Sequence, residues 1–73
     1  MIKFDKELNN LREYVIEAGD MILEALRNAR VSLINGDMEI ANQVIDNDIN
    51  VNRISYKIES TCLKILLLEH PVA

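Results

Sequence analysis

The sequence predicts an all-α protein built as an antiparallel hairpin of two long helices. Apolar residues recur at spacings of three and four over two stretches of about 30 residues each, which is typical of amphipathic helices. One strong turn signal separates the two stretches. The chain is 49% hydrophobic with one Phe, two Tyr, no Trp and two Gly, whereas β-rich domains use aromatic residues and frequent turns.

The first expected helix covers about residues 4–35. Gly19 lies inside it and costs roughly 1 kcal/mol of helix propensity relative to Ala, which close approach of a neighbouring helix would explain. The apolar residues of this stretch are Phe4, Leu8, Leu11, Val15, Ala18, Ile22, Ala25, Ala29 and Leu33.

The expected turn is Asn35-Gly36-Asp37. Gly is the favoured residue just after the end of a helix. Asp37 is well placed to cap a new helix, and Glu39 adds an acidic residue to the first turn of that helix. A tight connection of this kind makes the two helices antiparallel neighbours.

The second expected helix covers about residues 38–70, and each helix should be about 45 Å long at a rise of 1.5 Å per residue. His70, before Pro71, would complement the dipole of the helix C-terminus. Asn47 and Thr61 fill two gaps in the periodic pattern. The apolar residues that define it are Ile40, Val44, Val51, Ile54, Ile58 and Ile65.

Two helices alone cannot enclose a core, because ordering costs roughly 1.5 kcal/mol per residue and one seam buries too little surface. We therefore expect a homo-oligomer, a dimer or higher, in which two hairpins form a four-helix bundle. Residues 63–68 are apolar around most of the helix, which requires a further contact. The residues assigned to the core seam or an oligomer contact are Leu8, Leu11, Val15, Ile22, Val44, Val51, Ile54, Ile58, Ile65 and Leu66.

Composition and charge exclude several classes of protein. The net charge of −4 argues against a nucleic-acid partner, which requires a clustered basic face. The longest apolar run, residues 65–68, is far too short to span a membrane, and the first residues contain no signal-peptide core. A single cysteine, Cys62, cannot form an intrachain disulfide, so we expect a cytoplasmic protein. We expect Cys62 itself to be a buried, inert thiol.

Polar residues crowd the start of the second helix. At about 100° per residue, Asp46 and Asn50 point away from the apolar seam, whereas Asp48, Asn52 and Glu59 lie beside it with Ser55. This row is either a solvated border of the seam or a site for a hard cation such as Mg²⁺, Ca²⁺, Mn²⁺ or iron, which prefer oxygen ligands. The candidate metal ligands are Asp48, Asn52 and Glu59.

Three segments together resemble the repeat of the PhoU family of bacterial and archaeal phosphate-uptake regulators. They are FDKELNNLREYVIEAGDMILEAL in the first helix, INGDMEIANQVIDND around the turn and IESTCLKILLLEHPVA at the end. The resemblance covers nearly the whole chain in one register. It implies that residues 1–73 correspond to the first two helices of one three-helix repeat, and hence to a fragment or truncated member of a longer family.

The resemblance also implies a metal motif and a function. The family's acidic E/D-x-x-x-D motif falls on Asp48 and position 52, where this chain has Asn; an amide ligates a cation without adding charge. Family members restrain phosphate uptake by linking a phosphate transporter to a membrane sensor kinase, so we expect a non-enzymatic regulator acting through protein contacts.

Two other functions are compatible with the residues: a generic helical oligomerisation module without a phosphate role, and a metal-binding helical bundle. The chain has no Gly-rich phosphate loop and no nucleophile paired with a base. An enzyme is therefore the class that the sequence supports least.

Overall fold

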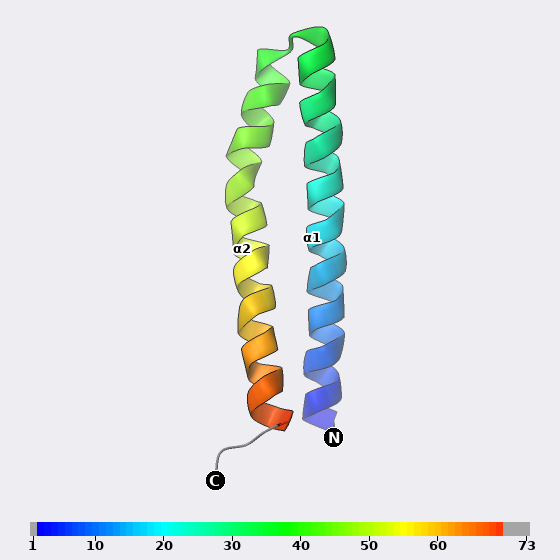
Figure 1. The fold of residues 1–73 in the computed structure, drawn as a ribbon, viewed down its shortest axis with the longest axis vertical. Helices are drawn as coiled ribbons and strands as arrows, with labels where there is room; N and C mark the ends of the chain where they lie inside the picture. Colours follow the sequence, from blue (N-terminus) through cyan, green and yellow to red (C-terminus); the bar gives the residue numbers. More distant parts are fainter. Residues whose placement is uncertain (1, 70–73) are drawn as a thin grey trace.

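Two long helices make up the part of the chain that the structure describes, residues 2–69. In this computed structural model, α1 spans Ile2–Asn35 and α2 spans Met38–Glu69. The helices pack side by side in opposite directions (Figure 1). The predicted all-α antiparallel hairpin is confirmed. His70 and Pro71 lie outside the described residues.

The turn between the helices is fixed by Gly36 and Asp37. Gly36 has a φ of 64°, a left-handed conformation that suits Gly because it has no Cβ. The Asp37 N–H then donates to the Ser32 carbonyl at 3.0 Å, a bond that closes the end of α1. Asp37 Oδ1 accepts hydrogen bonds from the backbone N–H groups of Glu39 at 3.0 Å and Ile40 at 3.1 Å. Asp37 therefore caps α2, as the sequence predicted.

The two helices meet along a seam in which contacting positions alternate between spacings of three and four. A strict repeat of this kind is typical of a left-handed coiled coil. Every seam residue is buried or half-buried. On α1 the seam residues are Phe4, Glu7, Leu11, Tyr14, Ala18, Met21, Ala25, Asn28 and Ser32; on α2 they are Ile40, Val44, Asn47, Val51, Ile54, Ile58, Thr61, Ile65 and Leu68.

Two hydroxyl groups inside this seam are satisfied locally. Thr61 is buried, and its hydroxyl donates to the Lys57 carbonyl at 2.7 Å. The Ser32 hydroxyl donates to the Ala29 carbonyl at 2.8 Å. The Lys57 ammonium lies 5.6 Å from the centre of the Tyr14 ring, a cation–π distance that ties α2 to α1 beside the seam.

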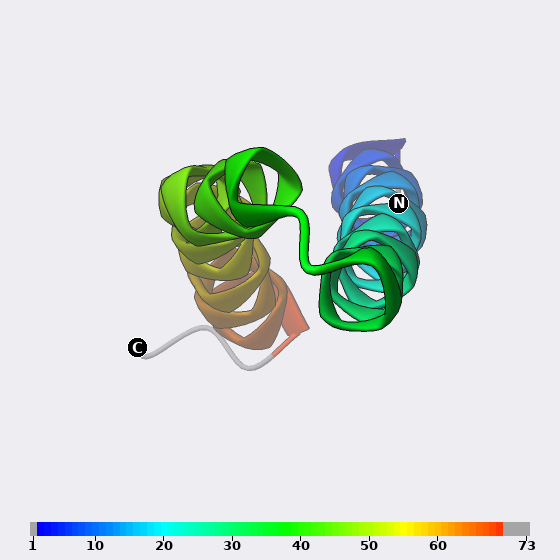
Figure 2. The same cartoon turned by 90° about the horizontal axis from the view of Figure 1, so that it is seen from above.

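The seam forms a shallow core. Its only buried apolar residues are Ala18, Ile54 and Ile65, and no large side chain in the described part of the chain is fully buried. The molecule measures 57 × 17 × 11 Å, and its radius of gyration is 16.8 Å, against about 11 Å for a globular chain of this length. Figure 2 shows the two helices as a single layer. Most of each helix surface therefore faces outward.

Candidate interaction surface

A line of large apolar residues runs along α2 on the side opposite α1. At about 100° per residue, these residues lie roughly 180° around the helix from the buried seam. They are 62–71% exposed, and Met38 continues the line toward the turn. We call this line the outer stripe of α2; it consists of Ile45, Ile49, Tyr56, Leu63 and Leu67.

The outer stripe makes α2 apolar on two opposite sides. A helix that packs against one neighbour has one apolar side and one polar side. An exposed apolar line of this length marks a surface that contacts another molecule or another segment. Neither helix within residues 2–69 is long and apolar enough to cross a membrane.

A second exposed line lies on α1, beside the seam. Its members are 38–62% exposed, and we call it the α1 stripe: Leu8, Val15, Ile22 and Leu26. Gly19 lies on the same side of the helix, and a Cβ added there would meet nothing within 4 Å. Packing against α2 therefore does not explain Gly19, and the room above it stays available to a further helix.

The residues that the sequence assigned to the core seam or an oligomer contact fall into a buried group and an exposed group in the hairpin. Six of them are buried or half-buried between the helices: Leu11, Val44, Val51, Ile54, Ile58 and Ile65. Four others, Leu8, Val15, Ile22 and Leu66, are exposed in the hairpin. A role for these four in an oligomer contact stays a prediction.

The candidate metal ligands lie on one exposed side of α2, between the seam and the outer stripe. With a rise of 1.5 Å per residue, Asp48 and Asn52 are separated by about 6 Å along the helix and Asn52 and Glu59 by about 10 Å. Asp48 and Asn52 can therefore approach one ion, but Glu59 of the same chain cannot join them. Hard cations take six or more oxygen ligands, some of them from water, so these two side chains of one chain would supply only a small part of a coordination shell.

Residues 2–69 contain no group of three or more His, Cys, Asp or Glu side chains that could hold a metal ion. Cys62 is a free thiol that is half-buried rather than buried as predicted, because it lies beside the apolar seam and not in it.

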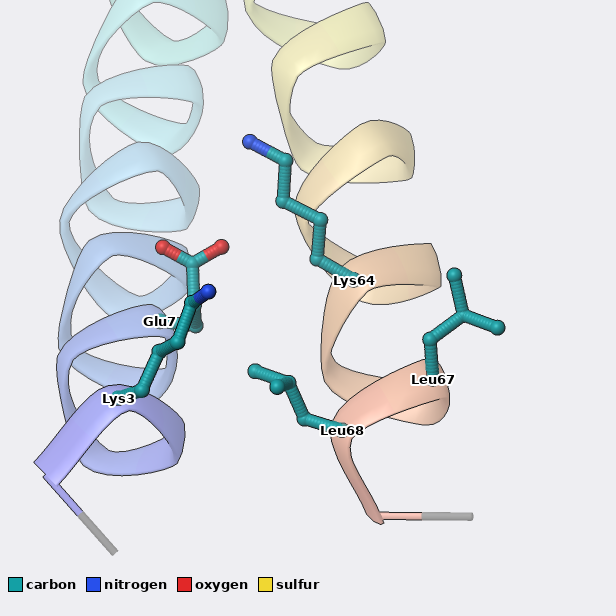
Figure 3. Close-up of a pocket in the computed structure, with 5 residues that line it drawn as sticks. All are labelled: Lys3, Glu7, Lys64, Leu67 and Leu68. Atoms are coloured by element: carbon teal, nitrogen blue, oxygen red, sulfur yellow. The ribbon is translucent and has the colours of Figure 1, made fainter. Parts of the chain in front are cut away.

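A cavity of about 410 Å³ lies between the helices at the end far from the turn. Lys3 and Glu7 line it from α1, and Lys64, Leu67 and Leu68 line it from α2 (Figure 3). Leu68 points toward α1, whereas Leu67 points away from the gap. The cavity offers charged groups over an apolar wall, but the described residues that line it include no hydroxyl or thiol that could act as a nucleophile.

Sequence reasoning anticipated the C-terminal end of the outer stripe, within residues 63–68, but missed Ile45, Ile49 and Tyr56, although the signal is present. Within α2 the spacings of Ile45, Ile49, Tyr56, Leu63 and Leu67 are four, seven, seven and four, a second periodic set interleaved with that of the seam. A search for two apolar lines in one helix would have found it.

Comparison with known proteins identifies relatives across most of the chain. The PhoU domain matches residues 15–73. The chain is similar to the phosphate-specific transport system accessory protein PhoU of Serratia marcescens, with 32% identity over 97% of this chain and 29% of that protein. It is also 32% identical to the Escherichia coli K12 protein of the same name, over 97% of this chain and 30% of that protein.

An archaeal protein extends this range of relatives. The accessory protein PhoU homolog 2 of Methanothermobacter thermautotrophicus is 38% identical over 94% of this chain and 32% of its own length. The chain thus spans less than a third of the length of the relatives it matches. No solved structure gives a significant match.

Proposed function

This chain belongs to the PhoU domain family, and from that membership we propose that it is a non-enzymatic regulator of phosphate uptake and phosphate homeostasis. The observation that carries the proposal is the match over residues 15–73, together with relatives named as accessory proteins of phosphate-specific transport. Those names describe accessory proteins, which agrees with the expectation that the chain is not an enzyme.

The chain acts by contact with other proteins, namely a phosphate transporter and a sensor kinase, on the cytoplasmic side of the membrane. The α1 stripe is suited to this contact because it presents large aliphatic side chains beside a polar helix surface. The net charge of −4 adds attraction to basic patches on a partner, which accelerates encounter more than it strengthens binding. Shape and apolar contact then decide affinity.

Disruption of the gene, followed by complementation, tests the proposal. We expect disruption to release phosphate-responsive genes from repression in phosphate-rich medium and the intact gene to restore it. Val15→Glu should fail to restore repression, because it places a charge in the α1 stripe. Ile16→Glu is the matched control: the two residues are adjacent and similarly exposed, at 51% and 58%, but Ile16 lies outside the stripe. Normal phosphate regulation in the disrupted strain would refute the proposal.

A generic helical oligomerisation module is the competing function, and the exposed apolar lines favour it as well. Co-purification separates the two. The regulator should retain components of a phosphate transporter or a sensor kinase, and Val15→Glu should lose them. A stable oligomer that retains neither would identify the chain as an oligomerisation module.

A further inference from the structure

We propose that the outer stripe of α2 binds the outer stripe of a second copy of this chain in antiparallel orientation, with Tyr56 at the two-fold axis. This proposal goes beyond the regulatory function and does not depend on it. The stripe consists of Ile45, Ile49, Tyr56, Leu63 and Leu67, all exposed on the side of α2 opposite the seam. Leu67, at the end of the stripe, also borders the cavity.

The spacing of the stripe is symmetric about Tyr56. Ile49 and Leu63 each lie seven residues from it, and Ile45 and Leu67 each lie eleven residues from it. In a two-fold contact, residue i meets residue j while j meets i. An antiparallel second copy therefore places Ile49 opposite Leu63 and Ile45 opposite Leu67, and Tyr56 meets Tyr56. Each apolar residue of the stripe thereby receives an apolar partner. A parallel pair would place each residue opposite itself and would not need a spacing that is symmetric about Tyr56.

Charges beside the stripe complement each other in the same register. Asp46 and Lys64 are eighteen residues apart, or five turns at about 3.6 residues per turn, so both lie on one flank of the stripe. In the antiparallel pair, Asp46 falls within about 3 Å, measured along the helix, of Lys64 of the second copy. Symmetry forms this opposite-charge pair twice, which fixes register more than it adds affinity.

The other flank of the stripe carries polar residues that also find partners. Asn52 falls opposite Glu59 of the second copy, so the amide N–H can donate to the carboxylate. The polar row that raised the question of a cation site thereby acquires a role as the border of an interface. No two carboxylates are brought opposite each other in this register.

The exposed area of the hairpin is large enough for such a contact. The chain exposes 5962 Å², whereas a folded protein of 8.4 kDa exposes about 4600 Å². The excess is about 1400 Å², and a stable dimer removes about 800 Å² from each partner. One contact through the outer stripe uses much of that excess and leaves the α1 stripe free.

Disulfide cross-linking of single-cysteine variants tests the register. In a Cys62→Ala background, Tyr56→Cys should cross-link with itself under mild oxidation, because the two Cα atoms meet at the axis within the reach of a disulfide. Ile49→Cys should not cross-link alone, since its own copies lie about 21 Å apart along the pair. Mixed with Leu63→Cys, it should form the heterodimeric cross-link.

Sedimentation equilibrium of the 73-residue chain provides the second measurement. We expect a dimer, at least a tenfold increase in dissociation constant for Ile49→Glu, and no change for Ile16→Glu on α1. Asp46→Lys should weaken the dimer, and Lys64→Asp added to it should restore the dimer. A monomer without cross-linking at position 56 would overturn the proposal and leave the stripe to another protein or segment. Self-cross-linking of Ile49→Cys would overturn the antiparallel register.

Discussion

The same substitution should have opposite effects at the two glycines. Gly19 lies in the interior of α1, and a Cβ there would meet nothing within 4 Å. Ala is the better helix former by about 1 kcal/mol, so Gly19→Ala should stabilise the hairpin by about that amount. A Cβ at Gly36 would also meet nothing within 4 Å, but its φ is +64°. Gly36→Ala should therefore destabilise the hairpin by about 1–2 kcal/mol through backbone strain alone.

These free energies convert into measurable shifts of the melting temperature. A change of 1 kcal/mol shifts Tm by about 4–8 °C in a domain of 60–100 residues. The two variants should therefore melt at least about 8 °C apart, on either side of the wild type. Thermal unfolding followed by far-UV circular dichroism measures this, at one protein concentration because association raises the apparent stability. Gly36→Asn is the control and should lose less than Gly36→Ala, because Asn adopts the left-handed conformation more readily.

Two results would refute this reasoning. If Gly36→Ala melted with the wild type, the left-handed turn would not be the form populated in solution. If Gly19→Ala melted below the wild type, the space above Gly19 would be occupied in solution. That result would show that another helix packs closely against α1 at this position, the explanation that the sequence first suggested for Gly19.

Three further substitutions test the cap, the core and the polar row. Asp37→Ala removes the acceptor of two backbone N–H groups and should cost about 1 kcal/mol, measured by urea unfolding; Asp37→Asn should retain most of this stability, and equal losses for the two would contradict the capping role. Ile54, only 4% exposed, should lose about 2–4 kcal/mol on substitution by Ala, whereas Ile16→Ala on the surface should lose far less; similar losses would show that the seam is not the core. Asn52→Asp adds a second carboxylate one turn from Asp48 and should raise the affinity for Mn²⁺ on the order of tenfold, since charge on the ligands tunes affinity. Isothermal titration measures this, and adding Asp48→Ala should remove the gain. Unchanged affinity in Asn52→Asp would show that the two residues are not cation ligands.

The architecture could be predicted because its determinants are local. A glycine followed by a capping aspartate ends one helix and starts the next through hydrogen bonds that span only a few residues. Amphipathic periodicity on both sides of that turn then requires the helices to pack together. Neither inference needs knowledge of residues distant in the sequence, so the sequence alone was sufficient.

Which apolar residues of each helix face the other helix, and which stay exposed, could not be predicted in the same way. On α1 the apolar arc is wide enough to include both Leu11, which faces α2, and Val15, which is half exposed. Which edge of the arc meets α2 depends on how two helices supercoil around each other, a property of the pair. Tyr14 and Met21 enter the seam for this reason, because they continue a repeat of 3.5 residues rather than 3.6.

The joining of both helices through one two-residue turn has a consequence for how the molecule opens. Contacts beside Asp37 join residues that are close in the sequence and so close short loops. At the other end, Glu7 and Lys64 line the same cavity, and a contact there closes a loop of nearly the whole described chain. Because closure entropy rises with loop length, the hairpin should zip from the turn and fray from the other end. Amide hydrogen exchange should therefore slow steadily from Lys3 and Leu68 toward the turn. A ligand that entered the cavity would clamp the least protected part of the molecule, so even weak binding there would be visible as exchange protection along both helices.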